Sequence, residues 1–187
     1  MADKKNDVKG LSIEIKIDEK INLQLNGSML TLKGPKGEVK RDFPDKRVDI
    51  SYKEGAITLK APKLSKTNKK IVKSYAAHIK NMANGVLDGY KYTLKICSGH
   101  FPMNVSMSSG NFIVKNFLGE KVPRTLKLKH GAQVKVEGDV VVVESPDKEI
   151  AGQVSADIEL LTRRTKYDTR IFQDGIWITS KCGKEMK

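Results

Sequence analysis

The sequence predicts an α+β protein built from two similar modules, each a small, mainly antiparallel sheet packed by one helix. Three observations predict this class. Stretches of alternating apolar and polar residues occur in both halves of the 187-residue chain, a stretch with helical period follows them in each half, and this order is repeated. We expect a duplication, with modules at residues 1–86 and 87–187 and no Gly/Ser or Pro-rich linker between them.

The first module begins with strands joined by tight turns. Strict alternation predicts half-buried strands at residues 12–18, 21–25, 29–32, 48–52 and 56–60. Asn26-Gly27 supplies the positive φ angles of a hairpin turn, and Lys53-Glu54-Gly55 predicts a second turn. The basic, Gly-rich segment 33–37 contains a Pro and lies between strands, so it predicts a third turn and not a phosphate-binding loop.

A helix of about five turns is predicted after these strands, beginning at Ser65. Its apolar side consists of residues spaced three or four apart: Ile71, Tyr75, Ile79, Met82 and Val86. Gly85 is placed as its C-terminal cap.

The second module repeats this plan. Alternation predicts strands at residues 90–96, 103–107, 112–114, 133–137 and 140–143, with turns at Ser108-Ser109-Gly110 and Gly138-Asp139. Ser145-Pro146 predicts a helix cap followed by Pro at the first helical position, and Arg163-Arg164 suits the far end of that helix. Its expected buried stripe is Ile150, Val154, Ile158 and Leu161. A basic stretch, residues 115–129, separates two of these strands, and a loop is predicted around residues 116–119 within it.

An ungapped shift of 111 residues superposes part of the two halves. It places Leu23 on Val134, Gly27 on Gly138 and Pro35 on Pro146. Asp88-Gly89 and Asp174-Gly175, which follow the two predicted helices, also match, at a shift of 86 residues. The repeat is therefore inexact, with different insertions in the two modules.

The net charge of +13 indicates a polyanionic partner, and nucleic acid is the first candidate. Only 6% of the residues are aromatic, which favours phosphate and shape recognition over stacking of bases on aromatic platforms. No acidic residue lies between Gly55 and Leu87, where the lysines are Lys60, Lys63, Lys66, Lys69, Lys70, Lys73 and Lys80. This run favours an anion at the first helix or, equally, forms a solvated lysine face.

Two further basic clusters lie in the second module. One runs from Lys115 to Lys135, with Glu120 as its only acid. The other follows the second helix, where hydrogen-bonding residues such as Gln173 and Thr179 alternate with charges. Arginine suits a bidentate phosphate contact, lysine acts as a point charge, and amides or hydroxyls suit the ribose 2′-OH. This mixture predicts contacts with nucleic acid.

The sequence contains no recognisable catalytic or metal-binding motif. Its three histidines and two cysteines lack ligand spacing, and no nucleophile elbow, phosphate-binding loop or zinc-protease motif is present. We therefore expect a non-enzymatic protein without cofactor or metal. No apolar run is long enough for a signal core or a membrane span, which predicts a soluble, intracellular protein.

Four motifs together carry a resemblance to a known family. They are Lys33-Gly34-Pro35-Lys36-Gly37 followed by Arg41-Asp42-Phe43, His100-Phe101-Pro102-Met103-Asn104-Val105, Lys115-Asn116-Phe117-Leu118-Gly119-Glu120-Lys121, and Phe172-Gln173-Asp174-Gly175-Ile176. In this order they resemble the archaeal and eukaryotic branch of the large-subunit ribosomal protein six family, which is called protein nine of the large subunit in eukaryotes. The resemblance covers about residues 13–179.

The resemblance implies two duplicated α+β domains and a structural role in the large ribosomal subunit. It implies binding to large-subunit rRNA near the sarcin-ricin loop and the base of the factor-binding stalk, with neighbouring ribosomal proteins as further partners and neither a membrane nor a homo-oligomer. The expected location is the cytoplasm, with nucleolar assembly in a eukaryote.

The resemblance and the charge clusters together nominate nine rRNA-binding residues: Lys115, Asn116, Lys121, Arg124, Arg163, Lys166, Arg170, Gln173 and Lys181. In the family, the loop carrying Lys115 to Arg124 and the tail after the second helix make most RNA contacts. A free-standing RNA-binding regulator or a ribosome-assembly factor with the same fold is the alternative function.

Overall fold

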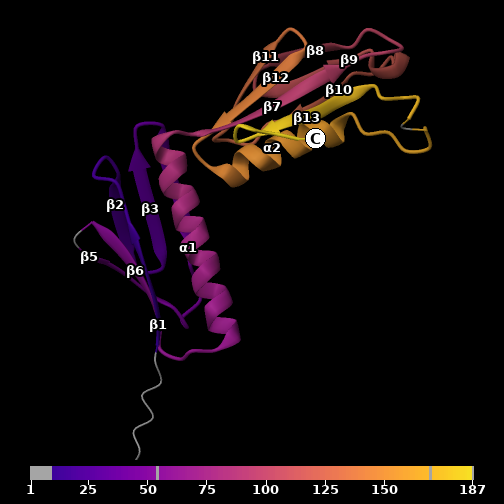
Figure 1. The fold of residues 1–187 in the computed structure, drawn as a ribbon. Helices are drawn as coiled ribbons and strands as arrows, with labels where there is room; N and C mark the ends of the chain where they lie inside the picture. Colours follow the sequence, from indigo (N-terminus) through magenta and orange to yellow (C-terminus); the bar gives the residue numbers. More distant parts are fainter. Residues whose placement is uncertain (1–9, 54, 169, 187) are drawn as a thin grey trace, which may run out of the picture. The chain divides into compact units, whose positions relative to one another are not determined.

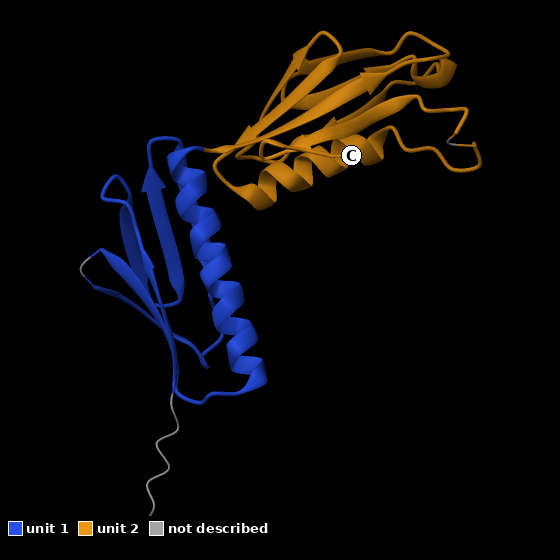
Figure 2. Cartoon of the chain, in the orientation of Figure 1, with its two compact units in different colours: residues 1–88 blue, residues 89–187 orange. Residues whose placement is uncertain are grey.

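A computed structural model describes residues 10–53, 55–168 and 170–186. The chain divides into two compact units, residues 1–88 and 89–187 (Figure 2). Among the described residues, each unit contains one long helix and several antiparallel strands, as the sequence predicts for an α+β protein of two modules (Figure 1). Glu54, in one of the predicted turns, lies outside the described residues.

Unit 1 contains two three-stranded antiparallel sheets, ordered β1-β6-β5 and β2-β3-β4. Its elements are β1 (Leu11–Lys16), β2 (Asn22–Asn26), β3 (Met29–Gly34), β4 (Gly37–Asp42), β5 (Asp49–Lys53), β6 (Ala56–Ala61) and α1 (Lys66–Leu87). The turn predicted at Asn26-Gly27 is confirmed, because Asn26 pairs with Met29 and Gly27 has a φ of 64°. The predicted third turn is also confirmed, since Gly34 pairs with Gly37 across it.

Helix α1 covers the strands of unit 1 through an apolar stripe. The Ser65 side chain accepts a hydrogen bond from the backbone N–H of Asn68 at 3.1 Å, which confirms the predicted start. The predicted end is wrong: Gly85 is buried inside the helix, and Asp88 is the C-terminal cap. The left-handed residue that ends the helix is Gly89, with a φ of 77°, so the helix continues two residues beyond Gly85, to Leu87.

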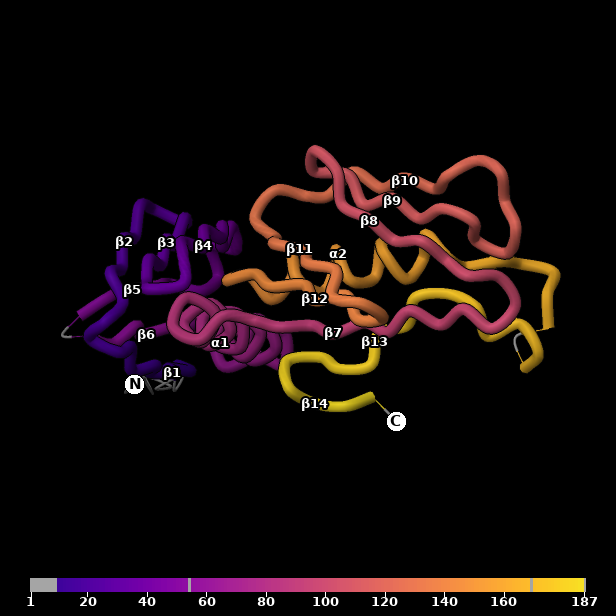
Figure 3. Tube along the Cα trace, turned by 90° about the horizontal axis from the view of Figure 1, so that it is seen from above, coloured from indigo at the N-terminus to yellow at the C-terminus, as the bar shows by residue number. Residues whose placement is uncertain are grey.

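Unit 2 contains a five-stranded sheet ordered β11-β12-β7-β13-β14 and a three-stranded sheet ordered β10-β9-β8. Its elements are β7 (Tyr90–Cys97), β8 (Asn104–Ser108), β9 (Asn111–Lys115), the 3-10 turn η1 (Phe117–Gly119), β10 (Arg124–Lys127), β11 (Gln133–Glu137), β12 (Val140–Ser145), α2 (Lys148–Leu161), β13 (Gly175–Lys181) and β14 (Lys184–Glu185). Figure 3 shows β8, β9 and β10 running side by side as a separate group.

Three sequence predictions for unit 2 are corrected by the structure. Helix α2 is capped by Asp147, whose side chain accepts from the backbone N–H of Glu149 at 2.8 Å, and not by Ser145. The Ser145 hydroxyl instead donates to the carbonyl of Gly131 at 2.7 Å. The loop expected to carry Lys115 to Arg124 ends where strand β10 begins, at Arg124, and the predicted C-terminal tail contains β13, which pairs with β7 inside the larger sheet.

The duplication is visible in the topology, but the 111-residue alignment pairs the wrong hairpins. The order β1-β6-β5 in unit 1 corresponds to β7-β12-β11 in unit 2, and β2-β3-β4 corresponds to β8-β9-β10. Ala56 and Val140, the first residues of β6 and β12, are 84 residues apart. Alternation alone cannot tell one hairpin from another, because every half-buried antiparallel strand has the same period.

Each unit has its own hydrophobic core between helix and strands. The core of unit 1 includes Leu30, Leu59 and Ile79, and the core of unit 2 includes Phe112, Phe117 and Ile158. Within the described ranges no helix is long and apolar enough to cross a membrane. Those ranges also contain no group of three or more His, Cys, Asp or Glu side chains able to hold a metal ion.

Candidate nucleic-acid interface

The nine nominated residues all belong to unit 2 and come from three segments. Lys115 ends β9, with Asn116 and Lys121 in the following loop and Arg124 opening β10. Arg163, Lys166, Arg170 and Gln173 follow α2, in the segment 162–174. Lys181 ends β13. The contacts between these segments decide which of the nine can act together.

Asp174 joins the segment after α2 to the loop that follows β7. Its Oδ1 accepts hydrogen bonds from the backbone N–H groups of Gly99 at 2.7 Å and of His100 at 2.9 Å, and its Oδ2 lies 2.6 Å from His100 Nδ1. The Asp174 side chain is 3% exposed. Because an ionised carboxylate can only accept, Nδ1 of His100 carries a proton in this contact.

The pKa of the Asp174 carboxyl is lower than its ordinary value. Burial raises this pKa, but the hydrogen bonds from the backbone and ring of His100 and from the backbone of Gly99 stabilise the ionised form and outweigh burial. Asp174 is therefore ionised, and its hydrogen bonds hold the segment after α2 against the loop that follows β7.

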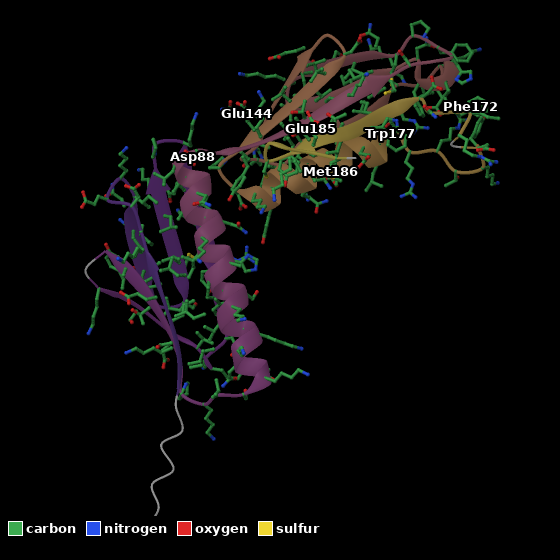
Figure 4. All side chains as sticks on the ribbon, viewed as in Figure 1. Asp88, Glu144, Phe172, Trp177, Glu185 and Met186 are labelled. Atoms are coloured by element: carbon green, nitrogen blue, oxygen red, sulfur yellow. The ribbon has the colours of Figure 1, made fainter. Side chains whose placement is uncertain are left out.

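Aromatic rings extend the connection from His100. The His100 ring stacks on Phe172, with ring centroids 4.7 Å apart and planes inclined by 24°. Tyr167 meets Phe172 edge to face at 4.8 Å, and the guanidinium of Arg164 lies 4.7 Å from the centre of the Tyr167 ring. Figure 4 shows Phe172 at one end of unit 2, opposite the end where Glu144 and Glu185 lie. The rings hold segment 162–174 against the loop of His100.

Glu120 connects the segment 115–124, which follows β9, to the segment 162–174. Its carboxylate accepts from Arg124 Nε at 2.8 Å and from Arg124 Nη2 at 2.7 Å, and Arg164 Nη1 lies at 3.3 Å. The hydrogen bond from Arg124 is the largest cause of a lowered pKa at Glu120, which burial opposes. Glu120 thereby connects the loop after β9 with the segment after α2.

Arg124 is fully engaged within the chain. Besides its two bonds to Glu120, its Nη1 donates to the carbonyl of Leu161, the last residue of α2, at 2.6 Å. Its guanidinium also lies 4.4 Å from the centre of the buried Phe117 ring. A cation on the C-terminal carbonyls of a helix is favourable for the helix dipole. The geometry makes Arg124 a residue that positions the loop.

The loop after β9 has an unusual backbone. Asn116, Leu118 and Gly119 have φ angles of 58°, 45° and 77°. A non-glycine residue in this region costs free energy and persists where the surroundings hold it, as the burial of Phe117 does here. The Asn116 side chain also donates to the carbonyl of Pro102 at 3.0 Å. This loop is held in one shape before any partner binds.

Several nominated side chains are exposed around this frame. Lys115, Lys121, Lys166 and Arg163 are exposed, and none has an ion pair with another described residue. Arg170 is exposed but pairs with Asp168, whose two carboxylate oxygens accept from its Nε at 3.1 Å and its Nη2 at 2.8 Å. The backbone carbonyl of Gln173 accepts a hydrogen bond from Trp177 Nε1 at 2.9 Å.

Lys181 lies apart from the other eight residues. It is six residues along β13 from Gly175, which places it about 20 Å away along the strand. It pairs with Tyr92 and Lys184, whereas Gly175 pairs with Cys97 beside the His100 loop. We call the convergent surface formed by segments 98–103, 115–124 and 162–174 the loop face.

Sequence reasoning did not assign a role to five of the residues that build the loop face: His100, Glu120, Tyr167, Phe172 and Asp174. His100, Glu120, Phe172 and Asp174 stood inside the recognised motifs, but their partners are up to 75 residues away. No local spacing signals such pairs. Exposed rings at or beside the loop face, Phe101 (48%), Tyr167 (41%) and Trp177 (40%), were also not nominated.

Comparisons with known proteins find one family. The model for "Ribosomal protein L6" matches the chain twice, at residues 17–89 and 101–175, and the starts of the two matches are 84 residues apart, like the first residues of β6 and β12. The large ribosomal subunit protein uL6 of Methanosarcina mazei is 39% identical over 175 residues, which cover 94% of this chain and 99% of that protein.

Two further relatives carry the same description. The uL6 protein of Methanococcus vannielii is 39% identical over 171 residues, covering 91% of this chain and 94% of the relative. That of Methanobrevibacter smithii is 40% identical over 168 residues, covering 90% of this chain and 94% of the relative. Both matches span nearly the full length of each chain.

Proposed function

The chain belongs to the ribosomal protein L6 family, and from this premise we propose that its loop face binds large-subunit rRNA near the sarcin-ricin loop and the base of the factor-binding stalk. Family membership makes the chain a structural, non-enzymatic constituent of the large ribosomal subunit. The proposal concerns the place of contact and the residues that make it. It includes neighbouring ribosomal proteins at the stalk base as partners, in the cytoplasmic ribosome.

One observation carries the proposal: exposed cations surround loops that are already locked together. Asp174, Glu120 and the rings from His100 to Tyr167 hold three segments in one arrangement, so RNA binding need not order them. Lys115, Lys121 and Lys166 can then neutralise phosphates on a surface of fixed shape. Such a surface recognises folded RNA by the positions of its phosphates.

The remaining nominated residues have different roles in this proposal. Arg163 and Arg170 offer guanidinium groups for bidentate phosphate contacts, and Arg170 would exchange its exposed pairing with Asp168 for a phosphate. Asn116 and Gln173 supply amides for phosphate or 2′-OH contacts. Arg124 positions the loop, and Lys181 makes a separate contact at the far end of β13.

A tethered cleavage probe tests where the loop face lies. The chain carries Lys121→Cys in a background in which Cys97 and Cys182 are replaced by Ser, and an iron chelate on the new thiol cleaves nearby RNA in assembled large subunits. We expect cleavage at the sarcin-ricin loop. The matched control, Lys53→Cys at the end of β5 in unit 1, should give no cleavage there. The same cleavage pattern from both positions would contradict the proposal.

Sedimentation separates this function from a free-standing regulator or assembly factor. A constituent of the subunit should migrate with large subunits at near-stoichiometric amounts after a high-salt wash, whereas a regulator or assembly factor should be lost. Binding to isolated rRNA should weaken with salt, with a log-log slope of about −0.7 for each phosphate met in irregular RNA. A salt-independent affinity would rule out the phosphate contacts.

A further inference from the structure

The outer face of α1, in unit 1, forms a second and separate positive surface. It carries five exposed lysines, Lys66, Lys69, Lys70, Lys73 and Lys80, and we call it the lysine face. At 3.6 residues per turn these lysines occupy about 100° of the helix circumference. From Lys66 to Lys80 they extend over about 21 Å at 1.5 Å per residue. The face is a straight positive stripe on a rigid element.

The core contacts of α1 lie on the other side of the helix. Val72, Ile79 and Val86 are fully buried against the strands of unit 1, so the helix cannot rotate to hide its lysines. Figure 4 shows side chains projecting from α1 away from the sheets of unit 1. The lysine side chains are therefore presented outward by the packing of the helix.

Acidic residues of unit 1 are segregated from this face. No acid occurs from Ala56 to Leu87, and Asp88 caps the far end of the helix. The other described acids of the unit lie on strands and turns: Glu14, Asp18, Glu19, Glu38, Asp42, Asp45 and Asp49. Among the described residues, Glu38 pairs with Lys40 and Asp45 pairs with Arg47, and no lysine of the face pairs with a described residue.

Helices α1 and α2 differ in the charges that lie at their ends. Helix α2 begins with Asp147 as its cap and Glu149 in its first turn, the arrangement that a helix dipole favours. Helix α1 has no acid in its first turn, where Lys66 and Lys69 lie, and no basic residue in its last turn. The charge distribution of α1 therefore does not complement its own dipole, and a bound anion at its lysines would reduce this unfavourable interaction.

The residue types exposed on α1 exclude several kinds of partner for the lysine face. Its other exposed positions are Thr67, Ser74, Ala77 and Asn84, so no large apolar side chain of the helix is available to a membrane or to an apolar peptide groove. The face also lacks aromatic rings for stacking single-stranded bases and arginines for bidentate base contacts. Lysines with small, mostly polar neighbours suit a regular row of phosphates.

We propose that the lysine face of α1 binds the sugar-phosphate backbone of double-helical RNA without regard to sequence. This contact adds to the loop face and does not depend on it, because the two surfaces belong to different units. It gives the first unit a function that neither its motifs nor its strands provide.

The test uses the full-length chain and a mixed-sequence RNA duplex of about 20 base pairs, with affinity measured over a salt series. The variant carries Lys66→Gln, Lys70→Gln, Lys73→Gln and Lys80→Gln, which keep good helix formers at exposed positions. Each lost phosphate contact should reduce the steepness of the log-log slope by about 0.9. We expect a reduction of about 2 to 4, with an unchanged circular dichroism spectrum.

A matched control removes the same charge from the strands and turns of unit 1. It carries Lys16→Gln, Lys20→Gln, Lys46→Gln and Lys53→Gln, all at exposed positions. The log-log slope of this control should change by less than the value for one phosphate contact, about 0.9. Equal changes in both variants, or no change in the helix variant, would overturn the proposal. Equally tight binding of a polyglutamate peptide would also overturn it, because the partner would then not be RNA.

A third variant, with substitutions in the loop face, separates RNA binding by the lysine face from the RNA binding proposed for unit 2. Lys115→Gln, Lys121→Gln and Lys166→Gln together remove lysines of the loop face. If the helix variant reduces the duplex slope equally with and without these changes, the lysine face acts by itself. If only the loop-face changes affect the slope, the lysine face is rejected and the function proposed for unit 2 stands.

Discussion

The carboxylate of Asp174 holds His100 through both its backbone and its ring, at 2.9 Å and 2.6 Å, although 74 residues separate them. With the bond from Gly99, one buried side chain closes the contact between two loops of unit 2. The lysines and amides of the loop face are positioned by this contact. Its removal should therefore affect stability and RNA binding together.

Asp174→Asn should destabilise unit 2 by about 1.5 to 3 kcal/mol, the usual range for hydrogen bonds to a charged group. Asparagine keeps an oxygen for the backbone N–H groups of Gly99 and His100 but places an NH₂ donor toward His100 Nδ1. Urea unfolding followed by fluorescence of Trp177, the chain's one tryptophan, measures the change. Glu137→Gln, at an exposed position in β11, is the control and should be neutral.

The stability contributed by Asp174 should depend on pH. Its folded-state pKa is lowered, so the contribution is present above the unfolded pKa of about 3.9 and is lost as the pH falls through the folded value. The difference in unfolding free energy between the wild-type chain and Asp174→Asn should therefore be largest near neutral pH and shrink below about pH 4. A difference that stays constant down to pH 3 would contradict this assignment.

Arg124 and Lys121 should behave differently when replaced by Gln. Arg124→Gln removes the bonds to Glu120 and Leu161, so it should cost about 1 to 3 kcal/mol of stability and weaken RNA binding with little change in salt slope. Lys121→Gln should leave stability unchanged and reduce the steepness of the slope by about 0.7. Urea unfolding and salt titrations on both variants provide the comparison. Identical profiles would mean that the two residues share one role.

Gly119→Ala tests whether the shape of the loop after β9 matters for binding. Gly119 and Gly110 both have a φ of 77°, so alanine should cost about 1 to 2 kcal/mol at either position. Gly119 adjoins the Phe101 ring in the loop face, whereas an added Cβ at Gly110 meets no atom within 4 Å. Only Gly119→Ala should also reduce rRNA affinity. Equal losses of affinity would show a general effect of destabilisation.

The local elements could largely be predicted from the sequence because their signals are local. Alternation located the hairpins, Ser65 marked the start of α1, and the charge pattern directed attention to unit 2. The predictions failed where two signals competed. The sequence predicts a cap at Gly85, although Gly89 ends the helix, and a cap at Ser145, although Asp147 provides it.

Strands β10 and β13 show a different limit. Neither strand has the alternating pattern that marks the predicted hairpins: β10 (RTLK) has one apolar residue, and β13 (GIWITSK) has three apolar residues in a row. They are strands because of their pairing: β10 pairs with β9 across an irregular loop, and β13 pairs with β7, which is distant in the sequence. The same limit hid the true duplication offset, since one hairpin has the same period as another.

The sequence by itself determined the class of fold, the family and the polyanionic partner, because motifs, period and net charge are properties of residue order. The tertiary structure alone decided which charged groups are available. It turned Arg124 inward onto Glu120 and Leu161, separated Lys181 from the loop face, and aligned the lysines of α1 on one outer face. The physical reason is that availability depends on hydrogen-bond partners and packing, and these are set by residues distant in the chain.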